Sequence, residues 1–141
     1  MDVRELTAAD RDATTALWSE VGLTRPWNSP GADFDRAVAG PTSCVLGAVD
    51  RGLAATAMVG HDGHRGWVYY LAVSPARRRS GLGRRMMTES ERWLRAHGAV
   101  KVNLMVRDDN PDALGFYERL GYEDAHTTVL AKWLAVSRER E

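Results

Sequence analysis

The sequence predicts one α/β domain of the α+β kind, in which helices cover a mixed sheet. Short apolar runs alternate with amphipathic stretches along the chain, and an apolar hairpin pattern precedes a long helical pattern. With 141 residues the chain has an ordinary length for one domain. We place that domain at residues 1–134 and expect residues 135–141 to form a charged tail.

The first third of the chain predicts a strand followed by two helices. Residues 3–23 begin with a short apolar run and continue as a helix, where Thr7 and Asp10 have the spacing of a capping box. Gly22 is placed to end this helix. Residues 24–34 carry two prolines and a glycine and predict a loop, and residues 33–40 predict a short second helix.

Two apolar runs around Asp50, Arg51 and Gly52 indicate a β-hairpin within residues 43–60. After it we expect a polar turn, a strand, a long helix, a strand, a helix that has Pro111 near its first turn, and a final strand or strand pair. In that order these elements span residues 61–66, 67–73, 82–98, 100–106, 108–122 and 123–134.

The composition excludes several classes of protein. Nineteen basic and nineteen acidic residues balance, which argues against a dedicated DNA-binding domain. The single Cys44 excludes an internal disulfide and a zinc-finger spacing, so we expect a buried thiol and no metal site. The chain has no apolar run of membrane-spanning length and no hydrophobic leader, so we expect a cytoplasmic protein that does not enter a membrane.

The stretch "SPARRRSGLGRR", residues 74–85, lies between a predicted strand and the longest predicted helix. A helix N-terminus offers free N–H groups, glycines allow close approach, and arginines add charge, which together favour an anion such as phosphate. A Walker loop would need Lys-Ser/Thr after Gly83, and a dinucleotide loop would need a small residue where Met86 stands. The pattern Arg/Gln-x-x-Gly-x-Gly/Ala fits from Arg78 to Gly83.

This motif resembles that of the GNAT acetyltransferases, which bind acetyl-coenzyme A. "YYLAVSPARRRSGLGRRMM" is similar to the family's central strand, pyrophosphate loop and helix, and "NLMVRDDNPDALGFYERLGYE" to the strand and helix that follow. "LTRPWNSP" and "GHDGHRGWVYYL" further resemble the small bacterial YpeA-like subgroup. The resemblance implies a mostly antiparallel mixed sheet with splayed central strands and about four helices.

The resemblance also implies a donor site. Leu71, Ala72 and Val73 would offer backbone groups to the acetyl-pantetheine arm, although the same residues also fit an ordinary core strand. The residues expected to surround the pyrophosphate are Arg78, Arg79, Ser80, Gly81, Leu82, Gly83 and Arg84. An exposed basic turn is the alternative. Arg77, Arg79 and Arg85 are either surface charges or contacts of the coenzyme's 3′-phosphate.

Two further residues match the family's second block. Tyr117 corresponds to the tyrosine that protonates the leaving thiolate, and its alternative is a core tyrosine. Asn110 corresponds to a contact of the coenzyme arm, and its alternative is a helix N-cap.

The general base and the acceptor site are left open by the sequence. Many relatives carry a glutamate near the start of the central strand, but residues 66–70 contain no carboxylate. Asp62, His64, Tyr69 or a water chain could remove the proton. Arg25, Trp27 and Asn28 lie where relatives build the acceptor lid, with Asp62 and His64 as further candidates, and a proline-anchored surface turn is the alternative for this lid.

We therefore expect an N-acetyltransferase that transfers the acetyl group of acetyl-CoA to a primary amine by direct attack in a ternary complex. A coenzyme A-binding sensor without activity is one alternative, because the carboxylate is missing. A nucleic-acid module that uses the arginines is a weaker one, because the chain is neutral. The expected partners are acetyl-CoA and an amine, without nucleic acid, and a monomer or homodimer fits equally well.

Overall fold

The computed structural model describes residues 1–135. The chain divides into two compact units, of which the first is Met1–Leu104 and the second begins at Met105. Most of the elements belong to the first unit, and the described residues of the second form one helix, α4 (Pro111–Arg119). The expected tail falls on residues 135–141, and residues 136–141 lie outside the described part of the chain.

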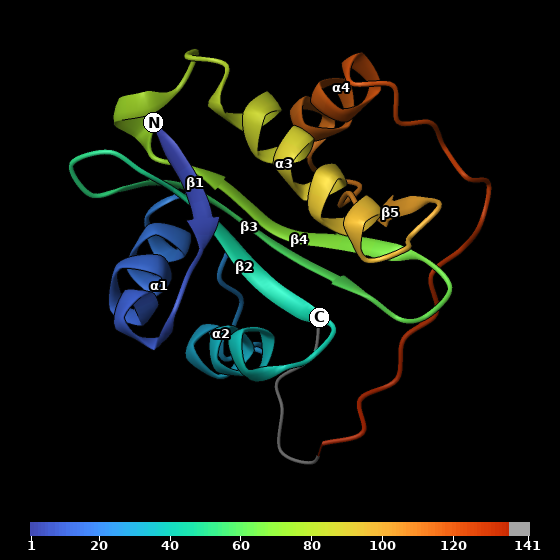
Figure 1. Ribbon diagram of the computed structural model, residues 1–141. Coiled ribbons are helices and arrows are strands. Elements are labelled where there is room, and N and C mark those ends of the chain that lie inside the picture. Colours follow the sequence, from blue (N-terminus) through green and yellow to red (C-terminus); the bar gives the residue numbers. More distant parts are fainter. Residues whose placement is uncertain (136–141) are drawn as a thin grey trace. The chain divides into compact units, whose positions relative to one another are not determined.

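The first unit is built on a five-stranded sheet in the order β1-β2-β3-β4-β5 (Figure 1). The first four strands are antiparallel neighbours, and β5 runs parallel to β4, so the expected mixed and mostly antiparallel sheet is confirmed. The strands are β1 (Asp2–Glu5), β2 (Ser43–Val49), β3 (Leu53–His61), β4 (Gly66–Val73) and β5 (Val102–Leu104).

Three α-helices cover this sheet, with α1 and α2 on one face and α3 on the other (Figure 1). They are α1 (Arg11–Glu20), α2 (Pro30–Ala39) and α3 (Leu82–Ala96), and short 3-10 turns span Ala8–Asp10 and Pro75–Arg77. The capping residue Asp10 accepts a hydrogen bond from the N–H of Thr7 at 2.9 Å, as the sequence predicts.

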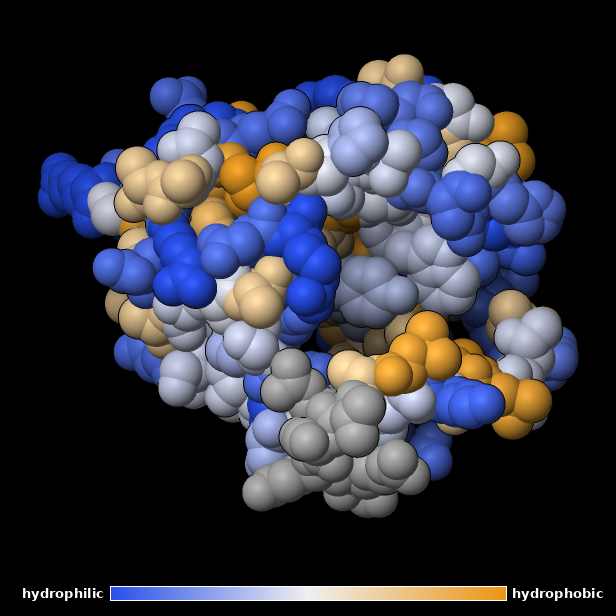
Figure 2. All heavy atoms as spheres, turned by 90° about the horizontal axis from the view of Figure 1, so that it is seen from below, coloured by the Kyte–Doolittle hydropathy of each residue, from blue (hydrophilic) through white to orange (hydrophobic). Residues whose placement is uncertain are grey.

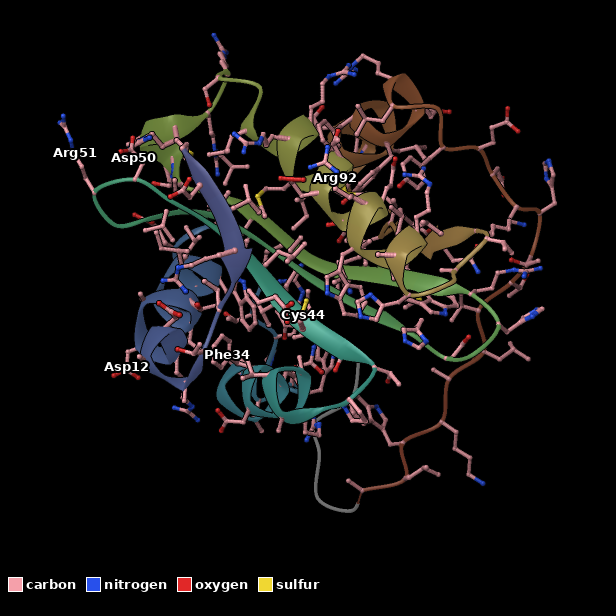
Figure 3. The ribbon with its side chains drawn as sticks, viewed as in Figure 1. Asp12, Phe34, Cys44, Asp50, Arg51 and Arg92 are labelled. Carbon is pink, nitrogen blue, oxygen red and sulfur yellow. The ribbon has the colours of Figure 1, made fainter. Side chains whose placement is uncertain are left out.

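The core has one layer on each face of the sheet. On the side of α1 and α2, Trp18 and Phe34 are fully buried and meet edge to face, and Phe34 lies between its helix and the strands (Figure 3). On the other side, α3 buries Met86, Met87 and Leu94. The helices are thereby fixed to both faces, and the start of α3 follows closely after the end of β4.

Two expected elements differ in length. Helix α2 begins at Pro30 instead of residue 33, because the Ser29 hydroxyl accepts a hydrogen bond from the N–H of Ala32 and proline suits the first turn. Strand β5 has three residues instead of seven and pairs with β4 over residues 66–68 alone. The sequence shows the apolar run, whereas the length of pairing depends on the neighbouring strand.

The final strand predicted over residues 123–134 is wrong for the structure described here, which has no strand in that range. Its apolar side chains Val129, Leu130 and Leu134 are largely exposed. Apolar alternation expresses a local preference, and a strand also needs a partner with which to pair.

The surface is mixed in character. On the face of the molecule in Figure 2, hydrophobic residues lie among hydrophilic ones. Among the described residues, no helix is both long and apolar enough to cross a membrane.

Candidate active site

Strand β4 changes its pairing halfway along its length. Gly66, Trp67 and Val68 pair with β3 on one side and with β5 on the other, and the pairing to β5 stops at Val68. Beyond that point residues 69–73 have β3 as their paired neighbour. A strand edge of this kind presents N–H and C=O groups that can accept an added extended chain. This edge includes Leu71, Ala72 and Val73, the segment that the resemblance assigns to the pantetheine arm.

A β-bulge lies in this second half of β4. Thr56 faces Ala72 and Met58 faces Tyr69, so that two residues, Tyr70 and Leu71, lie opposite Ala57 alone. Tyr70 has a φ of 51°, in the left-handed region, which for a residue with a side chain costs about 1–2 kcal/mol.

Tyr70 is held in place by three neighbours from different elements. Its carbonyl accepts a hydrogen bond of 3.0 Å from the Thr56 hydroxyl, and that hydroxyl accepts one of 2.9 Å from the indole N–H of Trp18. Its ring stacks on the Trp18 ring at 3.9 Å, and its phenol donates to Asp33 at 2.8 Å. Burial and the Asp33 carboxylate raise the pKa of Tyr70, so the phenol stays protonated at neutral pH.

The arginine–glycine loop, residues 78–83, connects β4 to α3 and exposes most of its residues. Gly81 has a φ of 79° and a Cβ built there meets no atom within 4 Å, so the backbone requires glycine while the space around it is open. The N–H of Arg85 bonds to the Gly81 carbonyl and closes the first turn of α3. The N–H groups of residues 82–84 therefore have no acceptor further back in the helix.

The arginines near this loop fall into two groups. Arg77 binds Asp50 at 3.1 Å and the Asp50 carbonyl at 2.8 Å, which fixes it to the β2–β3 turn, and Figure 3 shows Asp50 there. Arg78, Arg79 and Arg84 are exposed and have no ion pair within the described part of the chain. These three guanidinium groups are available to an anion.

The second unit contains Asn110 and Tyr117. Asn110 caps α4, because its side-chain oxygen accepts a hydrogen bond of 3.1 Å from the N–H of Ala113, so the N-cap role considered from the sequence is confirmed. Tyr117 packs edge to face against Phe116 and Tyr122. Burial raises the pKa of Tyr117 to about 12, which keeps the phenol protonated and able to donate a proton.

The three side chains considered as general base have different surroundings. The Asp62 carboxylate accepts hydrogen bonds from the N–H groups of Arg65 and His64 and from the Trp67 indole, and these lower its pKa to about 2. Such a carboxylate is a weak proton acceptor, and its contacts are those of a turn. Tyr69 is 43% exposed, and desolvation of the rest of its side chain raises its pKa.

His64 lies in the same turn, beside a cavity of about 140 Å³. His61, Arg65 and His97 also line this cavity, which lies next to the turn between α3 and β5. His64 therefore lies just before the first residue of β4. The loop of residues 78–83 follows the opposite end of the same strand.

The residues that the resemblance assigns to an acceptor lid lie in a loop between α1 and α2. Arg25 donates to the carbonyls of Gly22 and Thr24 at 2.8 and 2.9 Å, so its side chain shapes its own loop. Trp27 is half-buried and Asn28 is exposed. These contacts fit the proline-anchored turn and leave Trp27 and Asn28 as the residues that an acceptor could meet.

The sequence interpretation missed the polar residues around the bulge, among them a carboxylate. Asp33 comes from α2, binds the Tyr70 phenol and forms an ion pair of 2.7 Å with Arg36. Asp33 and Thr56 are far from Tyr70 in sequence, so no local pattern connects them. The one available signal was Thr56 itself, a lone hydroxyl in the apolar run 53–59.

Metal-ligating side chains and the single thiol were considered from the sequence, and the residues that the structure describes bear on both. No group of three or more His, Cys, Asp or Glu side chains among residues 1–135 could hold a metal ion. Cys44 is buried in β2, and its burial raises the pKa of the thiol to about 12. The expected burial of the thiol is therefore confirmed, and a thiol of this pKa forms little thiolate near neutral pH.

Comparisons with known proteins agree with this geometry. A model of the acetyltransferase (GNAT) family matches residues 4–122. Proteins described as acetyltransferases from Yersinia enterocolitica and Pectobacterium atrosepticum are each 37% identical over 140 residues, covering 99% of this chain and 99% of the relative. A relative from Yersinia pestis, described as an uncharacterized N-acetyltransferase, is also 37% identical over 140 residues with the same coverage.

Solved structures give the same result for the fold. A Bacillus halodurans protein is 27% identical, with a TM-score of 0.75 that covers 94% of this chain and 100% of the other. An aminoglycoside N-acetyltransferase in complex with CoA is 14% identical with a TM-score of 0.80, covering 95% of both chains. At that identity the second likeness shows the fold alone.

Proposed function

Because the chain belongs to the GNAT acetyltransferase family, we propose that it is an N-acetyltransferase that transfers the acetyl group of acetyl-CoA to a primary amine. The family uses acetyl-CoA as its donor. The observation that carries the proposal is the half of β4 beyond Val68, which pairs with β3 on one side only. After a short 3-10 turn it leads to a loop whose residues Arg78 and Arg79 have no ion pair among the described residues, and to the start of α3. An extended amide arm and a pyrophosphate are the two chemical groups that these features suit.

The residues of the chain fit such a donor. The backbone groups of Leu71, Ala72 and Val73 would pair with the pantetheine arm. The N–H groups at the start of α3 would bind the pyrophosphate, and Arg78, Arg79 and Arg84 would neutralise its charge. Asn110 caps α4 in this structure, and we propose that it also contacts the coenzyme arm. Since the family match spans both compact units, we propose that residues 1–134 act as one domain.

The proposed reaction is a direct attack by a neutral amine. The nitrogen forms a bond to the thioester carbonyl carbon while backbone N–H groups of β4 stabilise the charge on the oxygen. The carbon–sulfur bond then breaks, and Tyr117 donates a proton to the leaving thiolate. The amine proton passes to water or to a base, for which Asp62 is poorly suited because its pKa is about 2.

The test is a thiol-release assay with acetyl-CoA and a panel of amines that includes polyamines, amino acids, aminoglycosides and peptides. Release of coenzyme A that depends on the amine supports the proposal. The missing carboxylate on residues 66–70 motivates a coenzyme A-binding sensor as the second candidate. Tight binding of acetyl-CoA without turnover over the whole panel would favour that sensor.

Tyr117→Phe tests the acid. We expect turnover to fall roughly 100-fold while the Kd of acetyl-CoA changes little, because the phenol acts on the leaving group. The loss should be equal at about pH 7 and about pH 9, since the pKa of Tyr117 lies near 12. Tyr122→Phe removes a hydroxyl from a neighbouring ring and serves as the control. Equal turnover in Tyr117→Phe and the unaltered protein would remove Tyr117 from the mechanism.

A further inference from the structure

The bulge in β4 is held by a hydroxyl that makes two hydrogen bonds inside the core. Thr56 is fully buried between Ala55 and Ala57, which are fully buried as well. Its oxygen accepts from Trp18 at 2.9 Å and donates to the Tyr70 carbonyl at 3.0 Å. A buried hydroxyl is costly unless it is bonded, and here both its donor and an acceptor position are used.

The carbonyl that Thr56 binds belongs to the residue with the left-handed backbone. Tyr70 and Leu71 together lie opposite Ala57, and at this bulge the Tyr70 carbonyl accepts its hydrogen bond from the Thr56 hydroxyl. The orientation of the Tyr70–Leu71 peptide follows from this bond, because the carbonyl of Tyr70 and the N–H of Leu71 belong to the same planar unit. Thr56 thus fixes the direction of the first N–H of the segment 71–73.

Two helices reinforce the arrangement from one face. The Trp18 ring of α1 stacks on Tyr70 with an interplanar angle of 11°, and Asp33 of α2 accepts from the Tyr70 phenol. These same helices flank the loop that contains Trp27 and Asn28. The bulge is therefore fixed by α1, α2 and β3 together.

We propose that Thr56 is a positioning residue for the acetyl group: through the Tyr70 carbonyl it orients the Leu71 N–H toward the thioester oxygen. The proposal rests on the proposed function, since it takes acetyl-CoA to lie along β4. Coenzyme A has the pantetheine arm but no acetyl carbonyl, so loss of the Thr56 hydroxyl should weaken binding of acetyl-CoA more than binding of free coenzyme A, and should lower turnover.

The experiment compares Thr56→Val with Thr14→Val. Both threonines are fully buried, but the Thr14 hydroxyl donates to the Asp10 carbonyl at the start of α1, whereas the Thr56 hydroxyl donates to the carbonyl of the bulge residue Tyr70. In Thr56→Val we expect the preference for acetyl-CoA over coenzyme A, measured as a ratio of Kd values by calorimetry, to fall several-fold, and kcat to fall roughly tenfold. In Thr14→Val both should stay within about twofold, at a similar loss of thermal stability.

Thr56→Ser restores the hydroxyl and should recover both the Kd ratio and kcat. If Thr56→Val does not fold, the Tyr70→Phe variant takes its place in the test. This substitution removes the hydrogen bond between the ring and Asp33, and the preference for acetyl-CoA over coenzyme A should fall by a smaller factor than the one expected for Thr56→Val. A Kd ratio unchanged in every folded variant of the two residues would overturn the proposal. The ratio needs no acceptor, so absence of turnover in the unaltered protein would count against the proposed function alone.

Discussion

Two turns that contain arginine and glycine lie at opposite ends of β4. In one of them the backbone N–H groups have a hydrogen-bond acceptor within the turn, and in the other they do not. In the β3–β4 turn, residues 62–65, the Asp62 carboxylate accepts from two backbone N–H groups and from the Trp67 indole. In the arginine–glycine loop, residues 78–83, no carboxylate approaches the exposed arginines among the described residues, and the first N–H groups of α3 have no helical acceptor.

The first turn satisfies its own hydrogen-bond donors, whereas the second leaves donors that a ligand could use. Both turns contain a glycine with a positive φ, 86° at Gly63 and 79° at Gly81, and both glycines have open space around them. The glycines therefore do not distinguish the two turns. What distinguishes them is whether a side chain of the same turn satisfies the donors.

The largest effect expected from this comparison is that of Gly81→Ala against Gly63→Ala. Each substitution forces a Cβ into a left-handed backbone and should lower stability by about 1 kcal/mol. Gly81→Ala should also weaken acetyl-CoA binding by roughly tenfold or more, whereas Gly63→Ala should change it by less than about twofold. Thermal melts and calorimetry give both quantities. Equal Kd values in the two variants would break the distinction between the turns.

A smaller effect should separate the arginines. Arg79→Ala removes a charge that has no partner among the described residues and should weaken coenzyme A binding several-fold, more at low salt. Arg77→Ala breaks the contact with Asp50 and should cost less than about 1 kcal/mol of stability without a comparable loss of affinity. Titrations with coenzyme A and with its 3′-dephospho form would show which phosphate Arg79 meets. A greater loss of affinity in Arg77→Ala would reverse the assignment.

The smallest effect on activity is expected for Asp62→Asn. The carboxylate stabilises the folded turn in its ionised form, so its contribution is present above its ordinary pKa of about 4 and is lost as the pH falls to about 2. The variant should therefore melt below the unaltered protein at neutral pH, and this gap should close in acid. Turnover should stay nearly the same. A large loss of turnover at unchanged stability would instead make Asp62 the base.

The sequence predicts well those parts that local chemistry determines. The hairpin, the helix α3 and the glycine at its start all follow from short-range patterns, and the structure has each of them. The motif around Arg78 and Gly83 also led to the family that the comparisons show.

The remainder depends on partners that are distant along the chain. Thr56 contacts Trp18, 38 residues away, and Asp33 contacts Tyr70, 37 residues away. Nothing near Tyr70 in the sequence indicates that it adopts a left-handed backbone. The strand expected over residues 123–134 failed for a related reason, because apolar alternation carries no information about a pairing strand.

The buried Cys44 simplifies the measurement of activity. It is the only cysteine of the chain, and its pKa of about 12 leaves almost no thiolate near neutral pH. Disulfide reagents that report free coenzyme A by colour react with thiolates, so the folded enzyme should contribute no background of its own. A slow reaction of the protein alone with the reagent would then report local opening of β2, which exposes Cys44. One assay would thereby measure both release of coenzyme A and local unfolding.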